Sequence, residues 1–436
     1  MAARNGRTAV RSVDLSGALE PIDDVFDYDV VRVYAHHEGR VVGFTEVANR
    51  GEGVSASRLR ESLVDSLNIR VLADIDEDLS YALIVTALAE KLLPGGPEED
   101  MAEDLPLDRH VTASVVVATF DRPDDLRMCL GCLTGQQVDR DVEVVVVDNN
   151  PASGLTPPVV AEFPSVRLVE EARRGSSFAR NAGIRAATGD IILMTDDDVR
   201  APAHWVERLL APFGRPDVAG VTGNILPLEL EGSAQRLFEA YGGLGRGFRR
   251  KEFTPAWFEG RRSAVPTWEI GGTANTAFRS WVFQDPEIGL LHEALGAGIP
   301  AAVGEDTYLF YKVLKAGHTI AYEPDAWVWH RHRSDMAGLQ RQLYGYSKGH
   351  VAYHLTTLID DRDLRSLHYL AWKLPKSHFQ RLRQSAKGPS PYPIKLNLLE
   401  IAGNILGPLA FHQSRRLARQ AGAGPQSAAT NERTET

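Results

Sequence analysis

The strongest constraint on the fold of this chain is a series of apolar, β-branched runs between residues 113 and 195. These runs are "ASVVVATF" at 113–120, "VEVVVVDNN" at 142–150 and "DIILMT" at 190–195. Stretches of helical character lie between them, at 126–133 and 176–187. Strands that are buried on both faces of a parallel sheet have this continuous apolar character, and helices connect them. The pattern predicts an α/β domain with a mainly parallel sheet and helices on both of its faces.

Polar side chains follow these runs at the points where the predicted strands end. Thr119 to Arg122 and Asp148 lie at the ends of the first two runs, and Asp196, Asp197 and Asp198 follow the third. In open parallel sheets the ligand site lies beyond the carboxyl ends of the strands. We therefore expect a single crevice to collect these residues.

The three adjacent aspartates have two interpretations. One aspartate could cap the helix that "PAHWVERLL" begins, but three exceed what a cap needs. Clustered carboxylates repel one another unless a cation or a network of donors offsets their charge. Because Mg²⁺ binds one or two carboxylates together with phosphate oxygens, the triplet favours a site for a metal ion and a nucleotide.

Several domains are expected, since 436 residues exceed what one hydrophobic core usually supports. The run from Tyr28 to Val47 predicts a β-hairpin, and leucines at 59, 63 and 67 predict a helix. A second helix is expected at 79–93, before an acidic linker rich in Pro and Gly. The predicted units are a small α/β accessory domain at 1–105, a catalytic domain at 110–335, a C-terminal helical region at 336–420 and a disordered tail at 421–436.

Charge and composition exclude some classes of protein. The formal net charge of −10 is modest for this length and argues against a nucleic-acid-binding protein. The first residues lack the apolar core of a signal peptide, and no stretch reaches the roughly 20 apolar residues of a membrane-spanning helix. Cys129 and Cys132 lie in an apolar helical stretch and are expected to be reduced structural thiols. These features predict a cytoplasmic location.

Five stretches between about Thr112 and His332 resemble the family-two glycosyltransferases, which have the GT-A nucleotide-sugar fold. "VVVATFDRPDDLRMCLGCL" is similar to that family's first strand and helix, and "EVVVVDNNP" is similar to its second strand with an aspartate at the tip. "RRGSSFARNAGIRAATGDIILMTDDDV" resembles its Gly, Ala-Arg-Asn and D-x-D block. "IGGTANTAFR" and "GEDTYLFYKVLKAGH" resemble its acceptor loop and its acidic catalytic segment. The order of the five stretches is more specific than any one of them.

The resemblance implies a role for each donor-site residue. Thr119 and Asp148 would line the nucleobase pocket, with Asp148 accepting a hydrogen bond from a ring N–H. Arg180 would lie close to the base and the diphosphate. Asp196 would reach the ribose or the metal ion, and Asp198 would bind the metal ion. Asp197 stays unassigned within the donor site, because the triplet allows two registers of D-x-D.

The resemblance also implies the acceptor and catalytic residues. Gly271 and Gly272 would let the backbone approach the sugar or the acceptor closely, and an ordinary tight turn is the alternative. Asp306 would be the base that takes the proton of the acceptor hydroxyl, with Glu305 as an orienting or acceptor contact. The alternative for this pair is two acids that favour a helix N-terminus.

Two histidines follow the run "AWVW" and lie two residues apart. If the segment is extended, His330 and His332 share one face. In the family that the chain resembles, a histidine near this position can complete the metal shell. His330 is favoured over His332 as the ligand because it directly follows the β-like run "WVW". Imidazole suits Mn²⁺ better than Mg²⁺, but the cofactor is expected only to be one of these divalent ions.

The implied activity is inverting transfer of a sugar from a nucleotide-diphosphate sugar to an acceptor hydroxyl, by a hexosyltransferase-type enzyme. A UDP-sugar is the favoured donor. The acceptor could belong to cell-envelope, glycolipid, polysaccharide or secondary-metabolite glycosylation. The alternatives are a nucleotidyltransferase acting on a sugar phosphate and a non-catalytic nucleotide-sugar-binding protein. The first would need a phosphate loop rich in Gly and Lys, and the second would be expected to have lost the D-x-D motif or the base.

The C-terminal helical region allows two interpretations. The stretch "HYLAWKLPKSHFQRLRQ" mixes aromatic and basic residues, as in a helix that lies on an anionic membrane surface. It could equally be the solvated face of a helix that packs on the catalytic domain. The first interpretation predicts peripheral membrane association and allows a lipid-linked acceptor.

Overall fold

A nine-stranded mixed sheet forms the centre of the computed structural model, which describes residues 6–17, 19–37, 39–49, 53–66, 105–387 and 393–422. The strand order is β10-β12-β9-β11-β7-β4-β5-β6, and β8 pairs with β12. Strands β7, β4, β5 and β6 are mutually parallel, whereas β11 runs antiparallel between β7 and β9. The strands are β4 (Ala113–Thr119), β5 (Val142–Asp148), β6 (Val166–Glu170), β7 (Ile191–Asp196), β8 (Val199–Arg200), β9 (Val218–Pro227), β10 (Lys251–Phe253), β11 (Asn275–Arg279) and β12 (Thr319–His330).

Helices cover both faces of this sheet and bury its apolar side chains in two cores. One core contains residues of α6, α9 and α10, and the other contains residues of α4, α5 and α7. The helices are α4 (Pro123–Thr134), α5 (Thr156–Val160), α6 (Ser176–Ala186), α7 (Trp205–Leu210), α8 (Ser233–Ala240), α9 (Pro255–Glu259) and α10 (Glu305–Lys315). Short 3₁₀ turns lie at Pro151–Ser153, Ala211–Gly214, Thr267–Glu269 and Ser280–Phe283. Both free cysteines lie on α4, and Cys129 is buried.

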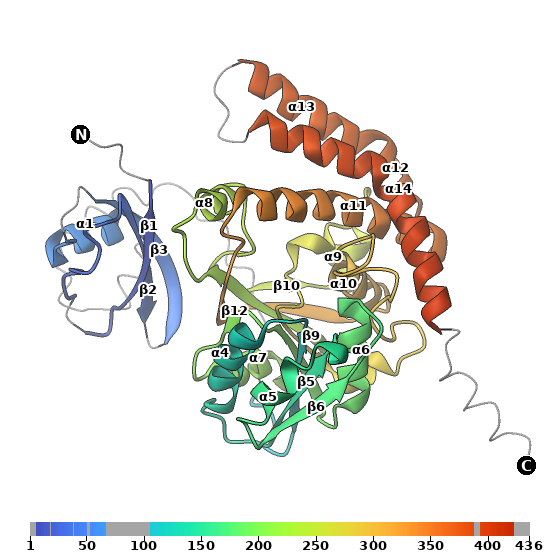
Figure 1. The fold of residues 1–436 in the computed structure, drawn as a ribbon, viewed down its shortest axis with the longest axis horizontal. Helices are drawn as coiled ribbons and strands as arrows, with labels where there is room; N and C mark the ends of the chain where they lie inside the picture. Colours follow the sequence, from blue (N-terminus) through green and yellow to red (C-terminus); the bar gives the residue numbers. More distant parts are fainter. Residues whose placement is uncertain are drawn as a thin grey trace, which may run out of the picture.

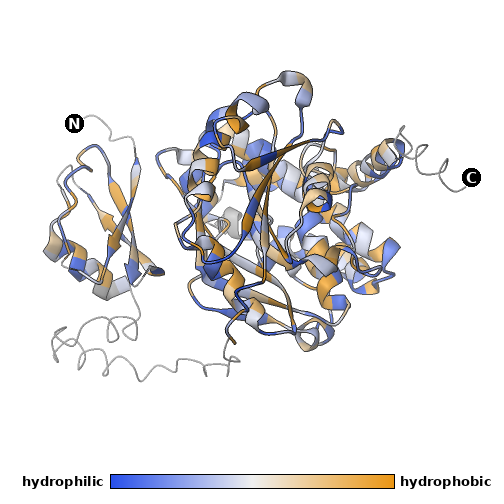
Figure 2. Ribbon diagram, turned by 90° about the horizontal axis from the view of Figure 1, so that it is seen from below, coloured by the Kyte–Doolittle hydropathy of each residue, from blue (hydrophilic) through white to orange (hydrophobic). Residues whose placement is uncertain are grey.

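A small second sheet precedes the catalytic sheet and contacts one side of it. It contains β1 (Thr8–Asp14), β2 (Val30–His37) and β3 (Arg40–Ala48), with α1 (Ala56–Ser66) packed on it. Hydrophobic stretches follow the strands of both sheets (Figure 2). Tyr34 of β2 meets Trp329 of β12 edge to face at 5.2 Å between ring centroids. The small sheet therefore packs against the strand that carries His330.

The C-terminal helices form a layer over α11 (Met336–Asp360), which lies between them and the catalytic sheet (Figure 1). They are α12 (Leu364–His368), a π-helical turn (Tyr369–Lys373), α13 (Leu374–Lys387) and α14 (Ile394–Gly422). A side chain at Gly407 of α14 would come 2.5 Å from the Cβ atom of Val351, so α14 and α11 approach each other closely. By length and composition alone, α14 could cross a membrane, which the sequence interpretation did not expect. Its inner face, however, packs against α11.

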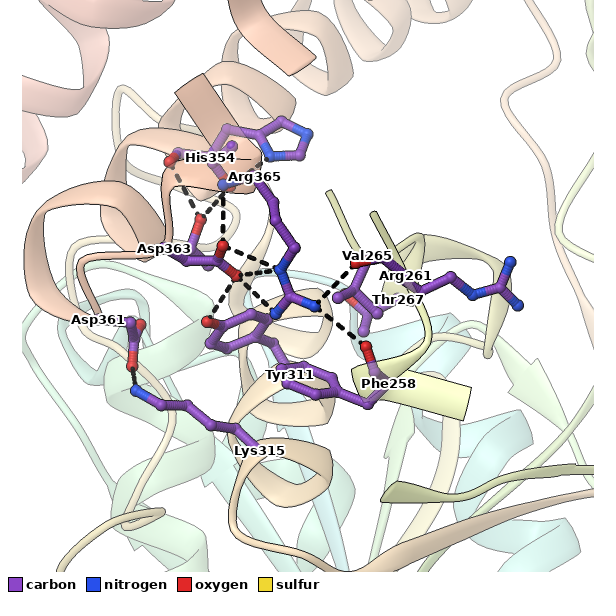
Figure 3. Close-up of polar contacts among 12 residues, drawn as sticks. Phe258, Arg261, Val265, Thr267, Tyr311, Lys315, His354, Asp361, Asp363 and Arg365 are labelled. Atoms are coloured by element: carbon purple, nitrogen blue, oxygen red, sulfur yellow. Dashed lines mark hydrogen bonds and ion pairs between the residues drawn. The ribbon is translucent and has the colours of Figure 1, made fainter. Parts of the chain in front are cut away.

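A cluster of polar contacts fixes the start of this layer on the catalytic domain (Figure 3). The Asp363 carboxylate accepts hydrogen bonds from the Tyr311 hydroxyl at 2.9 Å and from the Arg365 guanidinium at 2.8 Å. Arg365 also donates to the carbonyl of Phe258 at 3.0 Å, and Lys315 pairs with Asp361 at 2.7 Å. The orientation of α12 relative to the sheet is therefore set by buried and half-buried ionic contacts.

The predicted fold class is confirmed. The chain has a GT-A-like α/β domain with a mainly parallel sheet, a small N-terminal sheet and C-terminal helices. The predicted hairpin corresponds to β2 and β3, which pair antiparallel. The second helix predicted at 79–93, most of the acidic linker and nearly all of the predicted disordered tail lie outside the described residues. The predicted domain boundaries stay a prediction.

Candidate active site

The strand register places the predicted donor residues side by side at one edge of the sheet. Thr119 of β4 pairs with Asp148 of β5, and Ala118 pairs with Asp196 of β7. After Asp196 the chain turns into β8, where Val199 pairs with His330 at the end of β12. This pairing brings the histidine next to the aspartate triplet. The edge therefore collects residues that lie up to 211 positions apart between Thr119 and His330 in the sequence.

Asp196, Asp198 and His330 form a group whose ligand atoms lie within 4.8 Å of one another. Asp198 is buried, and His330 Nε2 lies 3.3 Å from its Oδ1 atom. Asp198 Oδ1 has no hydrogen-bond partner among the described residues. An orphaned carboxylate oxygen that faces an imidazole nitrogen fits a divalent cation, since such ions bind oxygen and imidazole nitrogen together. The structure thus brings together the three residues predicted as metal ligands.

Burial and charge together set the protonation of the ligands in this group. Burial opposes ionisation of Asp198, but attraction from His330, when that ring carries a proton, and from Arg122 outweighs burial and lowers the pKa of this carboxyl. Burial lowers the pKa of His330 in spite of its aspartate neighbours. An ionised carboxylate and a neutral imidazole are the forms in which these side chains bind metal ions.

Asp197 points away from this group and makes structural contacts instead. Its Oδ2 atom accepts a hydrogen bond from the Thr119 hydroxyl at 2.8 Å, and its Oδ1 atom accepts one from Arg122 at 3.0 Å. Burial and the nearby Asp198 raise the pKa of Asp197 to about 7. Arg122 also donates to Asp198 Oδ2 at 2.6 Å. The sequence placed Arg122 at the predicted crevice, directly after the first strand, but gave it no role.

Asp148 has the property expected of a carboxylate that binds a nucleobase. Its Oδ1 atom accepts a hydrogen bond from the backbone N–H of Asn150 at 2.9 Å. Its Oδ2 atom is buried and has no partner in the part of the chain that the structure describes. Because an unpaired buried carboxylate oxygen is costly, a ligand N–H that reached it would be bound strongly. The side chain is fully buried, so such a ligand requires neighbouring groups to open.

Arg180 connects the metal group to the catalytic segment. It lies on α6, is buried, and donates to Asp196 Oδ1 at 2.6 Å and to Glu305 Oε1 at 2.8 Å. Ser176 also donates to Glu305, at 3.2 Å. Burial and repulsion from Asp306 raise the pKa of Glu305 to about 7, although Arg180 opposes this shift. Glu305 therefore orients Arg180 and does not face the acceptor side.

Asp306 points toward the loop before β11. Its Oδ1 atom accepts hydrogen bonds from the backbone N–H and the hydroxyl of Thr307, at 2.6 and 3.1 Å. A side chain at Gly272 would lie 3.5 Å from the Oδ2 atom, so the glycine leaves space beside that oxygen. A Cβ atom at Gly271 would instead come 2.8 Å from the Cβ atom of Thr222. Gly271 is thus required by packing on β9, whereas Gly272 borders the candidate base.

His332 does not reach the metal group directly. It is buried, and its Nε2 atom lies 3.0 Å from Glu239 of α8. Its Nδ1 atom lies 3.4 Å from Nδ1 of His330. Sequence reasoning missed Glu239, because nothing in the sequence connects α8 with the end of β12.

The fold and the site define a nucleotide-sugar-dependent class of protein, and comparison with known families agrees. Residues 114–276 match the model described as glycosyl transferase family 2. The match confirms the predicted family resemblance over this segment. The matched segment contains the aspartate triplet and ends inside β11, before Asp306 and His330.

Similar proteins include several with named roles. The chain is 26% identical over 289 residues to the pre-mycofactocin glycosyltransferase of Mycobacterium tuberculosis, covering 65% of this chain and 54% of that protein. It is 26% identical over 244 residues to the succinoglycan biosynthesis protein ExoM of Rhizobium meliloti, covering 54% and 72%. The chain spans about half the length of the first of these relatives. Mannosyltransferase PcManGT from Pyrobaculum calidifontis, solved with GDP-Man and Mn²⁺, aligns with a TM-score of 0.44 and 19% identity over 81% of this chain and 86% of that one.

Proposed function

We propose that this chain is a divalent-metal-dependent, inverting glycosyltransferase that moves a sugar from a nucleotide-diphosphate sugar to an acceptor hydroxyl. The observation that carries the proposal is the convergence of Asp196, Asp198 and His330 beside Asp148, at the carboxyl edge of a family 2 domain. A UDP-sugar is the donor that we favour. Mn²⁺ is the favoured cofactor over Mg²⁺, because one of the three ligands is an imidazole.

Asp306 is the residue that we assign as the base. Its Oδ1 atom is held by Thr307, which leaves Oδ2 to take the proton of the acceptor hydroxyl. The hydroxyl oxygen then forms a bond to the anomeric carbon while the bond from that carbon to the diphosphate oxygen breaks. The electron pair leaves with the nucleoside diphosphate. Displacement from the opposite face inverts the anomeric configuration.

The donor end of the site has to hold a strongly anionic leaving group. A divalent cation bound at Asp196, Asp198 and His330 would supply charge that stabilises the departing diphosphate. Arg180 keeps Asp196 in place through its 2.6 Å contact, and Arg122 does the same for Asp198. These two arginines therefore position the ligands before a donor arrives.

A panel of nucleotide sugars tests the activity. We expect donor hydrolysis or transfer with Mn²⁺ for one donor class, and little without a divalent ion. Asp306→Asn should lower kcat about a hundredfold or more and leave donor affinity by calorimetry nearly unchanged. Formation of a nucleoside triphosphate and a sugar phosphate from the donor when pyrophosphate is added would instead indicate a nucleotidyltransferase. Binding without turnover for every donor would indicate a non-catalytic nucleotide-sugar-binding protein.

We further propose that the C-terminal layer rests on an anionic membrane surface and that the acceptor is lipid-linked. The outer faces of α12 to α14 expose large apolar side chains, including Trp372, Phe379 and Ile405, which are 65, 66 and 72% exposed. Between Leu364 and Gly422 the sequence has ten Lys and Arg residues and one acid, Glu400. Glu400 is buried and pairs with Arg381 at 2.8 Å.

This combination of charge and apolarity suits a membrane better than water or a protein partner. Exposed apolar residues recur along α12, the π-helical turn and α13 at 364, 367, 372 and 379, and on one face of α14 at 394, 398, 405 and 409. Lys373, Lys376 and Lys395 are exposed beside them. Basic residues next to an apolar face are typical of helices that bind anionic lipid interfaces.

Flotation with vesicles tests this surface. The full chain should float at low salt with vesicles that contain phosphatidylglycerol and much less with phosphatidylcholine alone. Replacing Trp372 and Phe379 with serine should abolish flotation. The matched control is Phe26→Ser, which removes an exposed phenylalanine of the N-terminal domain. Failure of the unmodified chain to float at low salt would refute the membrane proposal without affecting the activity proposal.

A further inference from the structure

A line of polar side chains leads from the candidate metal group to the N-terminal sheet. His330 Nε2 lies 3.3 Å from Asp198 Oδ1, and His330 Nδ1 lies 3.4 Å from His332 Nδ1. His332 Nε2 lies 3.0 Å from Glu239 Oε1, and the other Glu239 oxygen accepts from Arg32 Nη1 at 3.0 Å. The His332 side chain is 2% exposed, and those of Glu239 and Arg32 are each 13% exposed. The line is therefore shielded from water along most of its length.

When both histidines are neutral, the hydrogen-bonding capacity of each group places the protons along this line. An ionised carboxylate only accepts, so the contact with Glu239 requires a proton on His332 Nε2. A neutral imidazole protonated at Nε2 carries a lone pair at Nδ1. His330 must then donate from its own Nδ1 atom, which leaves a lone pair on its Nε2 atom. That lone pair faces Asp198 Oδ1, which has no hydrogen-bond partner within the described residues.

We infer that Glu239 is a positioning residue that sets the tautomer of His330, through His332, so that the Nε2 lone pair points at the metal ion. This inference rests on the proposed metal site. Metal-binding histidines commonly donate their other N–H to a fixed acceptor, which orients the ring and selects its tautomer. Here the acceptor is a second histidine, and its own acceptor lies on α8.

The N-terminal sheet stabilises the charge on which this arrangement depends. Arg32 of β2 donates to Glu239 and also to Glu46 of β3, at 2.9 Å from Nε and 2.7 Å from Nη2. Its guanidinium lies over the ring of Phe44, 4.7 Å from the centroid. Phe238 contacts the His332 ring edge to face at 5.0 Å between centroids. These contacts hold the Glu239 carboxylate and the His332 ring in fixed orientations, so the N-terminal sheet supports the metal ligand.

The test is the variant Glu239→Gln in the full chain. Glutamine has one side-chain oxygen, so it cannot accept hydrogen bonds from both His332 and Arg32 as the two carboxylate oxygens do. Its amide N–H₂ group donates, and therefore favours the opposite tautomer of His332. We expect the affinity for Mn²⁺ alone, measured by calorimetry and by electron paramagnetic resonance, to fall 10- to 100-fold. The matched control is Glu231→Gln, which removes the contacts of Glu231 with Arg7 and Tyr28 in the same domain interface but touches neither histidine. Its Mn²⁺ affinity should be unchanged.

Two further measurements separate tautomer control from a general structural effect. In the metal-free protein, nitrogen NMR of the imidazoles should show His330 protonated at Nδ1 in the unmodified chain, and a shift toward Nε2 in Glu239→Gln. His332→Asn places an amide oxygen near the original Nδ1 position, so it should accept from His330 without help from Glu239. Adding Glu239→Gln to His332→Asn should then cause little further loss of Mn²⁺ affinity.

Three results would overturn the inference. These are an unchanged Mn²⁺ affinity in Glu239→Gln, an unchanged His330 tautomer, and losses that simply add in the double variant. Failure of the unmodified chain to bind Mn²⁺ would refute the proposed metal site instead. The NMR measurement still tests the tautomer relay in that case, because it uses metal-free protein.

Discussion

Glu305→Gln is predicted to remove a loss of stability that the protein suffers as the pH rises. Glu305 begins α10 and is buried, with Arg180 and Ser176 as hydrogen-bond donors to one of its oxygens. Burial and repulsion from Asp306 outweigh the attraction of Arg180 and raise the pKa from 4.5 to about 7. Between these two values the native protein keeps a proton on Glu305 that the unfolded chain has released. The free energy of unfolding therefore falls as pH rises through this window.

The size of this effect follows from the shift in pKa. One pKa unit corresponds to about 1.4 kcal/mol, so the rise from 4.5 to about 7 amounts to about 3 kcal/mol. The loss is absent below pH 4.5 and complete above pH 7. A glutamine has the shape of the protonated carboxyl and does not titrate. The variant should therefore match the unmodified chain near pH 5 and become more stable than it by about 3 kcal/mol near pH 8.

Denaturant unfolding at several pH values measures this difference. The surface variant Glu259→Gln, which removes the same charge at an exposed position, is the control. Infrared difference spectra provide a second measurement, because Glu305→Gln should lose one protonated carboxyl contribution at pH 6, whereas that of Asp197 should remain. If the stability difference between the two proteins stayed constant from pH 5 to pH 8, the raised pKa of Glu305 would be wrong.

Three further predictions concern other parts of the molecule. Asp148→Asn should weaken donor binding in calorimetry roughly tenfold to a hundredfold, as expected for a lost charge-assisted hydrogen bond, and should not lower the melting temperature. Gly183→Ala should lower the free energy of unfolding in denaturant by about 1–3 kcal/mol, because the new Cβ atom would overlap Val116. An unchanged unfolding midpoint would show that α6 can shift to make room. Burial, with a contribution from His378, lowers the pKa of His350 from 6.5 to about 4. Between these values the unfolded chain binds a proton that the native protein does not, so the free energy of unfolding should fall by about 3 kcal/mol as the pH drops through this window. His350→Gln should flatten that fall.

The sequence predicted the catalytic sheet well because its strands carry their own signal. The runs that became β4, β5 and β7 are continuously apolar, and the structure buries nearly every residue in them. The residues at their ends follow from this pattern, since a parallel sheet places its carboxyl ends along one edge. The proximity of Asp148 and Asp196 could therefore be predicted from the sequence alone.

The partners of these residues could not be predicted in the same way. The contacts of the Arg122, Glu239 and Arg32 side chains join elements far apart in the sequence, and no periodicity encodes such contacts. The same holds for the packing of α14 on α11. The sequence showed an apolar stretch with Glu400 inside it, but the pairing of Glu400 with Arg381 depends on where α13 lies.

The aspartate triplet is divided between two sets of contacts at a turn. Asp196 ends β7, Asp197 and Asp198 form the turn before β8 begins at Val199, and Asp196 and Asp198 contribute ligand atoms to the group with His330. Asp197 binds Thr119 and Arg122, and Arg122 also holds Oδ2 of Asp198. One oxygen of Asp198 is thus fixed by a buried arginine contact, and the other faces His330. The middle aspartate therefore serves the two outer ones: it secures the arginine that restrains Asp198, so that the remaining oxygen is oriented toward the site that a cation would occupy.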